Sequence, residues 1–177
     1  LGCSKNLVDS EHMVGILKKK GFKTTEYADK ADYIIINTCS FIGDAQQESV
    51  NAILSAADIK NQVNSRAKII VTGCLAQKFG QELAKEIPEV DIIVGTNGFE
   101  KIDEYIESYE ETKKLIVDTD IHELDEDNLP RDILTERWYA YLKIAEGCSN
   151  NCTYCVIPKL RGPFKSRKIE NIVEEAR

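Results

Sequence analysis

The sequence predicts an α/β fold built around a doubly wound parallel sheet. Short β-branched runs alternate several times with stretches of helical periodicity, which is typical of βαβ units. These runs are unbroken by polar residues, as expected for strands buried on both faces. The chain has 177 residues, of which 42% are hydrophobic and 30% charged, so it can form one full core and little more.

The first helix is expected over residues 7–20, where apolar residues recur at helical spacing. Lysines gather at its C-terminal end, and Gly21 lies just past it. Asp44 is the candidate N-cap of the second helix. Further along the chain, Pro88 stops a helix and the glycines of residues 95–98 mark a turn. The expected strands are 33–36, 67–72, 91–94 and 115–117, and the helices between them are 44–57, 75–87 and 99–106.

Three cysteines stand at equivalent places in successive units. Cys3, Cys39 and Cys74, here called the first cysteine group, each follow the carboxyl end of a predicted strand and precede a helix. Ligands bind at that edge of open α/β sheets, and helix N-termini there favour thiolate over thiol. Cys39 taken alone would be interpreted as a core residue. Three cysteines at matching places favour a shared metal site with one open coordination position.

A second set of cysteines lies close together in sequence. Cys148, Cys152 and Cys155, here called the second cysteine group, have C-x3-C-x2-C spacing, with Gly147 before the first and Tyr154 before the last. A structural zinc site needs four protein ligands, and no further Cys or His lies nearby. On a four-iron cluster, three cysteines leave one iron free for a small molecule. A zinc knuckle or a chance cluster remains the alternative.

The second group resembles the signature of the radical S-adenosylmethionine (SAM) superfamily. With both groups in view, the chain resembles the methylthiotransferases of that superfamily, which insert sulfur into an unactivated C–H bond and methylate it. The resemblance implies two [4Fe-4S] clusters, one on each cysteine group, with SAM bound at the open iron of the second. It also places Tyr154 beside SAM, with core packing of the ring as the alternative.

Within that family, the chain is most similar to the RimO-type branch, which modifies an aspartate of a small-subunit ribosomal protein. The likeness rests on LGCSKNLVDSE at residues 1–11 and RGPFKSR at 161–167. The tRNA-modifying branch usually has another residue at Lys5. The structural alternatives are helix-start residues at positions 9–11 and a turn at 162–163.

The RimO-type likeness implies an enzyme that adds a methylthio group to the β-carbon of an aspartate. Its partners would be a small-subunit ribosomal protein, or the ribosome, and an electron donor. Two alternatives remain. The first is a tRNA methylthiotransferase, and the second is a non-catalytic iron-sulfur or metal-binding module.

The chain is expected to divide into two domains. Residues 1–117 would form the N-terminal cluster-binding domain, and 118–137, which are acidic and without sustained periodicity, a linker. Residues 138–177 would begin a radical SAM partial barrel, with 138–144 as its first strand. The opening residues read as the end of a strand, and a helical pattern runs to Arg177 without a stop signal. These features predict a fragment cut at both ends, unable to turn over alone.

Charge and composition narrow the function classes. The net charge of −7 argues against a surface that generally coats nucleic acid. The acidic stretch 118–127 and the basic stretch 159–168 are expected to be solvated. No apolar run reaches transmembrane length and no leader is present, so the cytoplasm is expected, with metal binding rather than disulfides for the six cysteines. His12 and His122 belong to no metal spacing and are expected to be ordinary surface or core residues.

Overall fold

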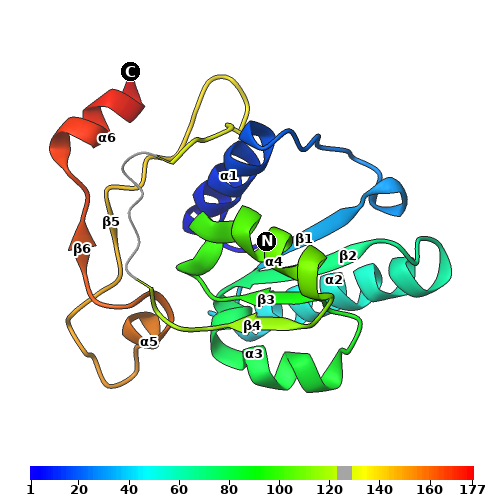
Figure 1. Ribbon diagram of the computed structural model, residues 1–177. Coiled ribbons are helices and arrows are strands. Elements are labelled where there is room, and N and C mark those ends of the chain that lie inside the picture. Colours follow the sequence, from blue (N-terminus) through cyan, green and yellow to red (C-terminus); the bar gives the residue numbers. More distant parts are fainter. Residues whose placement is uncertain (123–128) are drawn as a thin grey trace.

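The computed structural model describes residues 1–122 and 129–177 and confirms the α/β fold. A four-stranded parallel sheet in the order β1-β2-β3-β4 lies between two layers of helices (Figure 1). Side chains of α1 and α4 pack on one face, and those of α2 and α3 on the other. The elements are α1 (Ser4–Lys19), η1 (Ala28–Lys30), β1 (Tyr33–Thr38), α2 (Gly43–Gln62), β2 (Lys68–Gly73), α3 (Cys74–Glu86), β3 (Ile92–Val94), η2 (Gly98–Lys101), α4 (Ile102–Thr112) and β4 (Ile116–Asp118).

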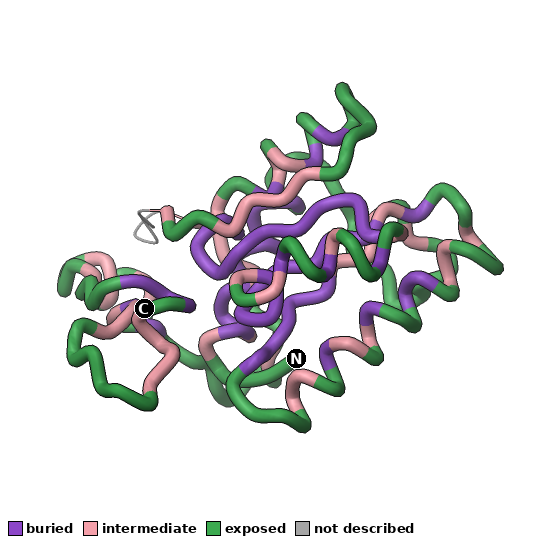
Figure 2. Tube along the Cα trace, turned by 90° about the horizontal axis from the view of Figure 1, so that it is seen from below, coloured by how far each residue is buried: buried purple, intermediate pink, exposed green. Residues whose placement is uncertain are grey.

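The strands of this sheet are buried on both faces, as their unbroken apolar runs predicted. Ile69 and Val71 of β2 pack toward α2 and α3, while Ile70 between them packs toward α1 and α4, and all three have no exposed surface. Figure 2 shows the buried residues running through the middle of the molecule. Each such side chain stabilises the fold by about 1.5–3 kcal/mol.

The ends of the first two helices differ in how well the sequence predicted them. Gly21, with φ +93°, ends α1 by letting the Phe22 amide donate to the Leu17 carbonyl at 3.0 Å. The predicted N-cap at Asp44 is wrong, because α2 begins at Gly43 with Ile42 as the N-cap and no side-chain cap. Asp44 lies inside the first turn, where its charge complements the helix dipole instead.

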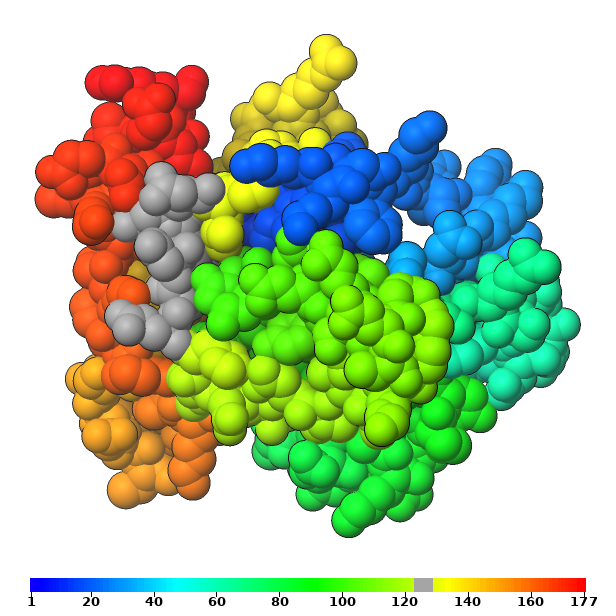
Figure 3. Space-filling view, viewed as in Figure 1, coloured from blue at the N-terminus to red at the C-terminus, as the bar shows by residue number. Residues whose placement is uncertain are grey.

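The C-terminal segment lies along one side of the sheet-containing body (Figures 1 and 3). Its two short strands pair in antiparallel fashion, with Ala145 opposite Ser166. The strand predicted over 138–144 is wrong: within the described residues these positions have no ladder partner, and Trp138 is 79% exposed. The beginning of a barrel stays a prediction. The elements here are β5 (Ala145–Glu146), α5 (Ile157–Arg161), β6 (Lys165–Ser166) and α6 (Ile169–Ala176).

The described part of the predicted linker packs along α1. The Asp132 amide donates to the Glu11 carbonyl at 3.0 Å, and the Arg131 side chain pairs with the Glu11 carboxylate at 2.5 Å. Gly15 allows this approach, because a Cβ there would lie 2.6 Å from the Pro130 carbonyl oxygen. Residues 123–128 of the predicted linker and acidic stretch lie outside the described residues, and the division into domains stays a prediction.

The described helices can be compared with the expectation that the chain has no transmembrane segment. Over residues 1–122 and 129–177, none of them combines the length and the apolar character that crossing a bilayer requires.

Candidate functional site

The carboxyl edge of the parallel sheet brings the first cysteine group together. Thr38 at the end of β1 lies opposite Gly73 at the end of β2, so Cys39 and Cys74 follow from neighbouring strand ends. Cys3 is the N-cap of α1. The Cys74 thiol lies within electrostatic range of both Cys3 and Cys39, whose charges would raise its pKa. Cys39 and Cys74 therefore lie at the carboxyl edge as expected, whereas Cys3 follows no strand within the described residues, and a shared metal site stays a prediction.

Gly2 carries Cys3 close to Cys39. Its φ of +88° lies in the region that favours glycine, and a Cβ there would be 2.7 Å from the Cys39 Cβ and 3.1 Å from its Sγ. The Asn6 Nδ2 donates to the Thr38 carbonyl at 2.8 Å and ties the start of α1 to the end of β1. The approach of the N-terminal residues to Cys39 therefore depends on the absence of a side chain at Gly2.

Two serines hold the backbone around the buried cysteines. The Cys39 amide donates to Ser49 Oγ of α2 at 3.0 Å, and that hydroxyl lies 2.8 Å from the Ala45 carbonyl to which it donates. Ser40 Oγ donates to the Cys74 carbonyl at 3.0 Å. All of these groups are buried or nearly so, so the cysteine positions are fixed by satisfied hydrogen bonds.

The turn from β2 into Cys74 requires glycine. Gly73 has φ +91° and ψ −160°, and a Cβ there would collide with Asn37 Oδ1 and lie 2.5 Å from the Thr38 carbonyl oxygen. The Asn37 amide nitrogen donates to the Asn6 carbonyl at 2.8 Å and to Ser10 Oγ at 3.0 Å. Asn37 therefore links β1 to α1 directly beside the turn that leads into Cys74.

The structure partly corrects the expectation that helix N-termini keep the cysteines of the first group as thiolates. Burial raises the pKa of the Cys74 thiol, while the nearby Arg161 guanidinium lowers it, and the net direction is upward. Cys74 is the first residue of α3, so the helix dipole alone does not make it a thiolate.

The second cysteine group lies on the loop between β5 and α5. The Cys148 amide donates to the Gly162 carbonyl at 3.1 Å, and the Cys155 amide to the Cys152 carbonyl at 3.0 Å. Cys152 is exposed and the other two are partly exposed, so these thiols are not hydrophobic filler. The core-packing alternative for Tyr154 is wrong, because this residue is 89% exposed.

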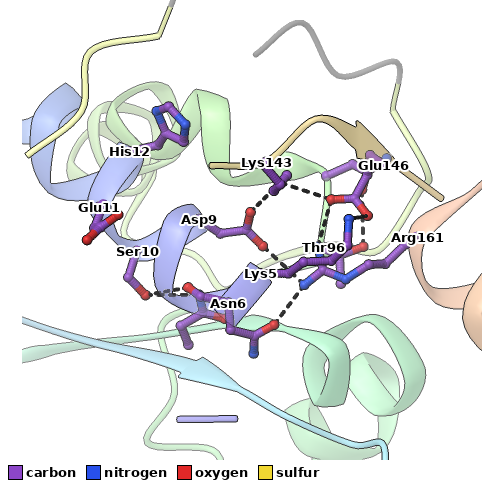
Figure 4. A network of polar contacts seen from close by, with 12 residues as sticks. Lys5, Asn6, Asp9, Ser10, Glu11, His12, Thr96, Lys143, Glu146 and Arg161 are labelled. Atoms are coloured by element: carbon purple, nitrogen blue, oxygen red, sulfur yellow. Dashed lines mark hydrogen bonds and ion pairs between the residues drawn. The ribbon is translucent and has the colours of Figure 1, made fainter. Parts of the chain in front are cut away.

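A buried network of charges, which the sequence did not reveal, joins α1 to the C-terminal segment (Figure 4). Arg161 lies at its centre. Its Nη1 is 2.9 Å from Glu146 Oε2, and its Nη2 is 3.1 Å from Asp9 Oδ2. The members of this junction network are Lys5, Asn6, Asp9, Lys143, Glu146 and Arg161.

The lysines of the junction network complete the pairing of its carboxylates. Lys143 Nζ lies 2.6 Å from Asp9 Oδ1 and 2.9 Å from Glu146 Oε2, and Lys5 Nζ lies 3.1 Å from Glu146 Oε1. Burial alone would raise the pKa of Glu146, but Lys143 and Arg161 lower it to about 2. Burial would lower the pKa of Arg161, but Asp9 and Glu146 raise it. Both groups are therefore ionised in the folded protein.

The structure contradicts two expectations about charged residues: that the basic stretch 159–168 is solvated throughout, and that residues 9–11 start a helix. In the basic stretch, only 3% of the Arg161 side chain and 8% of the Arg167 side chain are exposed, and both are paired with carboxylates. Asp9 and Glu11 are not helix-start residues, because α1 begins at Ser4 and both lie buried within it. His12 was expected to be an ordinary surface or core residue. It is a core residue, and its ring stacks on Phe99.

The donor chemistry of both cysteine groups fits the iron-sulfur clusters that the resemblance implies. Each group offers three thiols, which is the ligand type of such clusters. In residues 1–122 and 129–177, no group of three or more Cys, His, Asp or Glu side chains is already drawn together as a metal site. The fit therefore lies in the ligand type and in the shared sheet edge, and the thiols would have to close in around a cluster.

Comparison with known proteins bears on the N-terminal part of the site. Residues 1–95 match the family described as "Uncharacterized protein family UPF0004", and they make up more than half of the 177 residues. The chain belongs to this family. Its UPF0004 region contains the whole first cysteine group together with Lys5, Asn6 and Asp9 of the junction network.

The likeness to individual proteins extends beyond the UPF0004 region. The chain is 51% identical to a Clostridioides difficile protein named "Ribosomal protein uS12 methylthiotransferase RimO", over 100% of this chain and 40% of that protein. Proteins of the same name from Trichlorobacter lovleyi and Geotalea uraniireducens are 49% and 50% identical, over 99% and 100% of this chain. The expected RimO-type resemblance is confirmed. The chain spans about 40% of the length of these curated relatives.

Proposed function

We propose that the chain is part of a radical SAM methylthiotransferase that adds a methylthio group to the β-carbon of an aspartate in a small-subunit ribosomal protein. The proposal is supported by the RimO names of relatives that are 49–51% identical over essentially the whole chain. The observation that carries it is the presence of two three-thiol groups, one at the carboxyl edge of the sheet and one on the loop before α5. Three thiols per group are what clusters with an open iron need.

The chain's own residues would divide the work between the two groups. Cys3, Cys39 and Cys74 would hold one [4Fe-4S] cluster, and the second cysteine group would hold the other, with Tyr154 beside SAM. When bound, the clusters and SAM would supply hydrogen abstraction, sulfur and the methyl group. The bonds from Ser49 and Ser40 would keep Cys39 and Cys74 at the sheet edge, and the Cys148–Gly162 backbone bond would shape the second loop.

Iron content tests the two-cluster part of this proposal. After anaerobic reconstitution, we expect about eight irons per full-length chain, falling to about four when Cys3, Cys39 and Cys74 are changed to Ala. Acid-labile sulfide should fall in parallel. If the intact protein held about four irons and the triple variant kept them all, the first group would be core residues and the sulfur-donating half of the proposal would fail.

Mass spectrometry tests the substrate. In cells that lack the gene, the small-subunit ribosomal protein should lose a mass of roughly 46 Da, the difference between H and SCH3. Loss of a methylthio group from tRNA instead would assign the chain to the tRNA-modifying branch. Full-length, reconstituted protein should also cleave SAM, and iron binding without SAM cleavage would leave only a non-catalytic iron-sulfur module.

A further inference from the structure

Arg161 connects the two cysteine groups, which are far apart in sequence. We propose that Arg161 is a positioning residue that connects them: the residues on either side of it attach α5 to the sheet edge and to the loop of the second group, and its guanidinium supplies positive charge beside Cys74 of the first. This inference rests on the proposed function for the presence of a cluster on the first group. It goes beyond that function by giving a non-ligand residue a role in tuning that cluster.

The backbone around Arg161 is fixed at both sides. Leu160, which is almost fully buried, accepts a hydrogen bond through its carbonyl from Thr96 Oγ1, just after β3. On the other side, the Gly162 carbonyl accepts the Cys148 amide at 3.1 Å. The C-terminal end of α5 is therefore attached both to the carboxyl edge of the sheet and to the second cysteine loop.

The side chain of Arg161 reaches the first group. Its Nη2 lies 4.0 Å from Cys74 Sγ and 2.7 Å from Asn6 Oδ1. That amide oxygen is itself 3.8 Å from Cys3 Sγ. The planar guanidinium thus contacts the surroundings of two of the three thiols while its other nitrogen faces Glu146, a forked geometry that lysine cannot reproduce.

The charge of Arg161 favours the same role. Its guanidinium lies 4.0 Å from Cys74 Sγ, so it places a positive charge beside the first group. A reduced cluster carries one more negative charge than an oxidised one. Positive charge in a buried site therefore favours reduction and raises the midpoint potential.

The test is the midpoint potential of the first cluster, followed by electron paramagnetic resonance in the full-length, reconstituted protein. Changing Cys148, Cys152 and Cys155 to Ala removes the second cluster, so that only the first gives a signal. In this background, Arg161→Gln should lower the ratio of reduced to oxidised cluster about tenfold at a fixed potential. This corresponds to a shift of about 59 mV to more negative values for one electron.

Two further variants separate charge from structure. Asp9→Asn keeps the shape of a side chain that faces Arg161 but removes a negative charge, so it should shift the potential in the opposite direction. This variant carries the test if Arg161→Gln does not fold. Arg131→Gln is the matched control, because the Arg131 side chain is only 9% exposed and also joins α1 to the C-terminal segment, where it contacts Glu11, Glu175 and the Tyr141 carbonyl.

The outcomes separate this inference from the proposed function. Opposite shifts for Arg161→Gln and Asp9→Asn, with Arg131→Gln like the parent, support the inference that Arg161 tunes the first cluster through its charge. Iron on the first group with an unchanged potential in both variants, or the same shift in Arg131→Gln, overturns this inference alone. If the parent binds no iron at Cys3, Cys39 and Cys74, the proposed function fails and the inference fails with it.

Discussion

The guanidinium of Arg161 lies 4.0 Å from the thiol of Cys74, although 87 residues separate the two in the chain. Such a contact exists because α5 lies at the carboxyl edge of the sheet, where β1 and β2 deliver Cys39 and Cys74. Removing a buried arginine from its partners would leave two carboxylates inside the protein with less compensation, which is costly. The junction network therefore contributes to stability as well as to the site.

Glu146→Gln should destabilise the protein by about 3 kcal/mol at pH 7. The Glu146 carboxylate pairs with Lys5, Lys143 and Arg161, and breaking a buried ion pair at one partner leaves the others uncompensated. Urea unfolding measures the loss. The control is Glu174→Gln. Glu174 is exposed and forms a loose ion pair with Arg177 at 3.7 Å, so its substitution should change the free energy of unfolding by less than about 1 kcal/mol.

The same carboxylate predicts a pH dependence. Its folded pKa of about 2 lies below the ordinary value of 4.5, so its ionised form stabilises the fold at and above pH 4.5. This stabilisation is lost as the pH falls from 4.5 toward 2, and it amounts to about 3 kcal/mol. Glu146→Gln should lack this part of the acid sensitivity between pH 5 and pH 3. An equal decline in both proteins would contradict the assignment.

His12 predicts a second pH effect with its own window. Burial lowers the pKa of the His12 ring, and the Pro130 carbonyl, 3.2 Å from Nδ1, only partly opposes this. Nε2 has no partner among the residues that the structure describes. Because the folded pKa lies below the ordinary value of 6.5, the stability gained from the neutral ring is lost as the pH falls below 6.5.

His12→Gln is the variant that isolates this effect. Its amide can still reach the Pro130 carbonyl but does not titrate, so its stability should change less than that of the parent between pH 7.5 and pH 5.5. Thermal unfolding at the two pH values gives the comparison. A parent protein that is equally stable at both values would show that the ring does not titrate with folding.

The sequence predicted the sheet edge but not the buried charges, for physical reasons. Cys39 and Cys74 follow β-branched runs, and parallel strands end at a common edge, so their convergence could be inferred from periodicity alone. The burial of Arg161 depends on where α5 docks, which no local pattern encodes. The one available signal was Asn6 and Asp9, two polar residues three apart on the buried face of α1. The strand predicted over 138–144 does not form, because an alternation of apolar and polar residues does not by itself provide a neighbouring strand to pair with.

Ser49→Ala should lower the free energy of unfolding by about 1–3 kcal/mol and leave the backbone at Cys39 less firmly held. The substitution leaves the buried Cys39 amide without the Ser49 hydroxyl, to which it donates at 3.0 Å. Ser55→Ala is a control on the same helix, since Ser55 also bonds the carbonyl four residues earlier but is exposed, and it should cost less than about 0.5 kcal/mol. Chemical unfolding compares the two, and iron content should fall only for Ser49→Ala. Equal losses of unfolding free energy in the two variants would show that the hydrogen bond from the Cys39 amide to Ser49 does not contribute to stability.

Gly73→Ala should be the most damaging small substitution at the site. The Cβ would collide with Asn37 Oδ1 and lie 2.5 Å from the Thr38 carbonyl oxygen, at a φ of +91° that side chains rarely adopt. Gly21→Ala separates the two causes, because Gly21 has φ +93° but a Cβ there meets nothing within 4 Å among the described residues.

Backbone strain alone should make Gly21→Ala cost about 1 kcal/mol, whereas strain and collision together should cost roughly 3 kcal/mol or more at Gly73. Unfolding in urea gives both values. Because Gly73 directly precedes Cys74, we also expect Gly73→Ala to lower the iron content by up to about four per chain, the content of one cluster. Equal costs at the two glycines, with iron content unchanged, would show that the turn into α3 can open to accept a methyl group without moving Cys74.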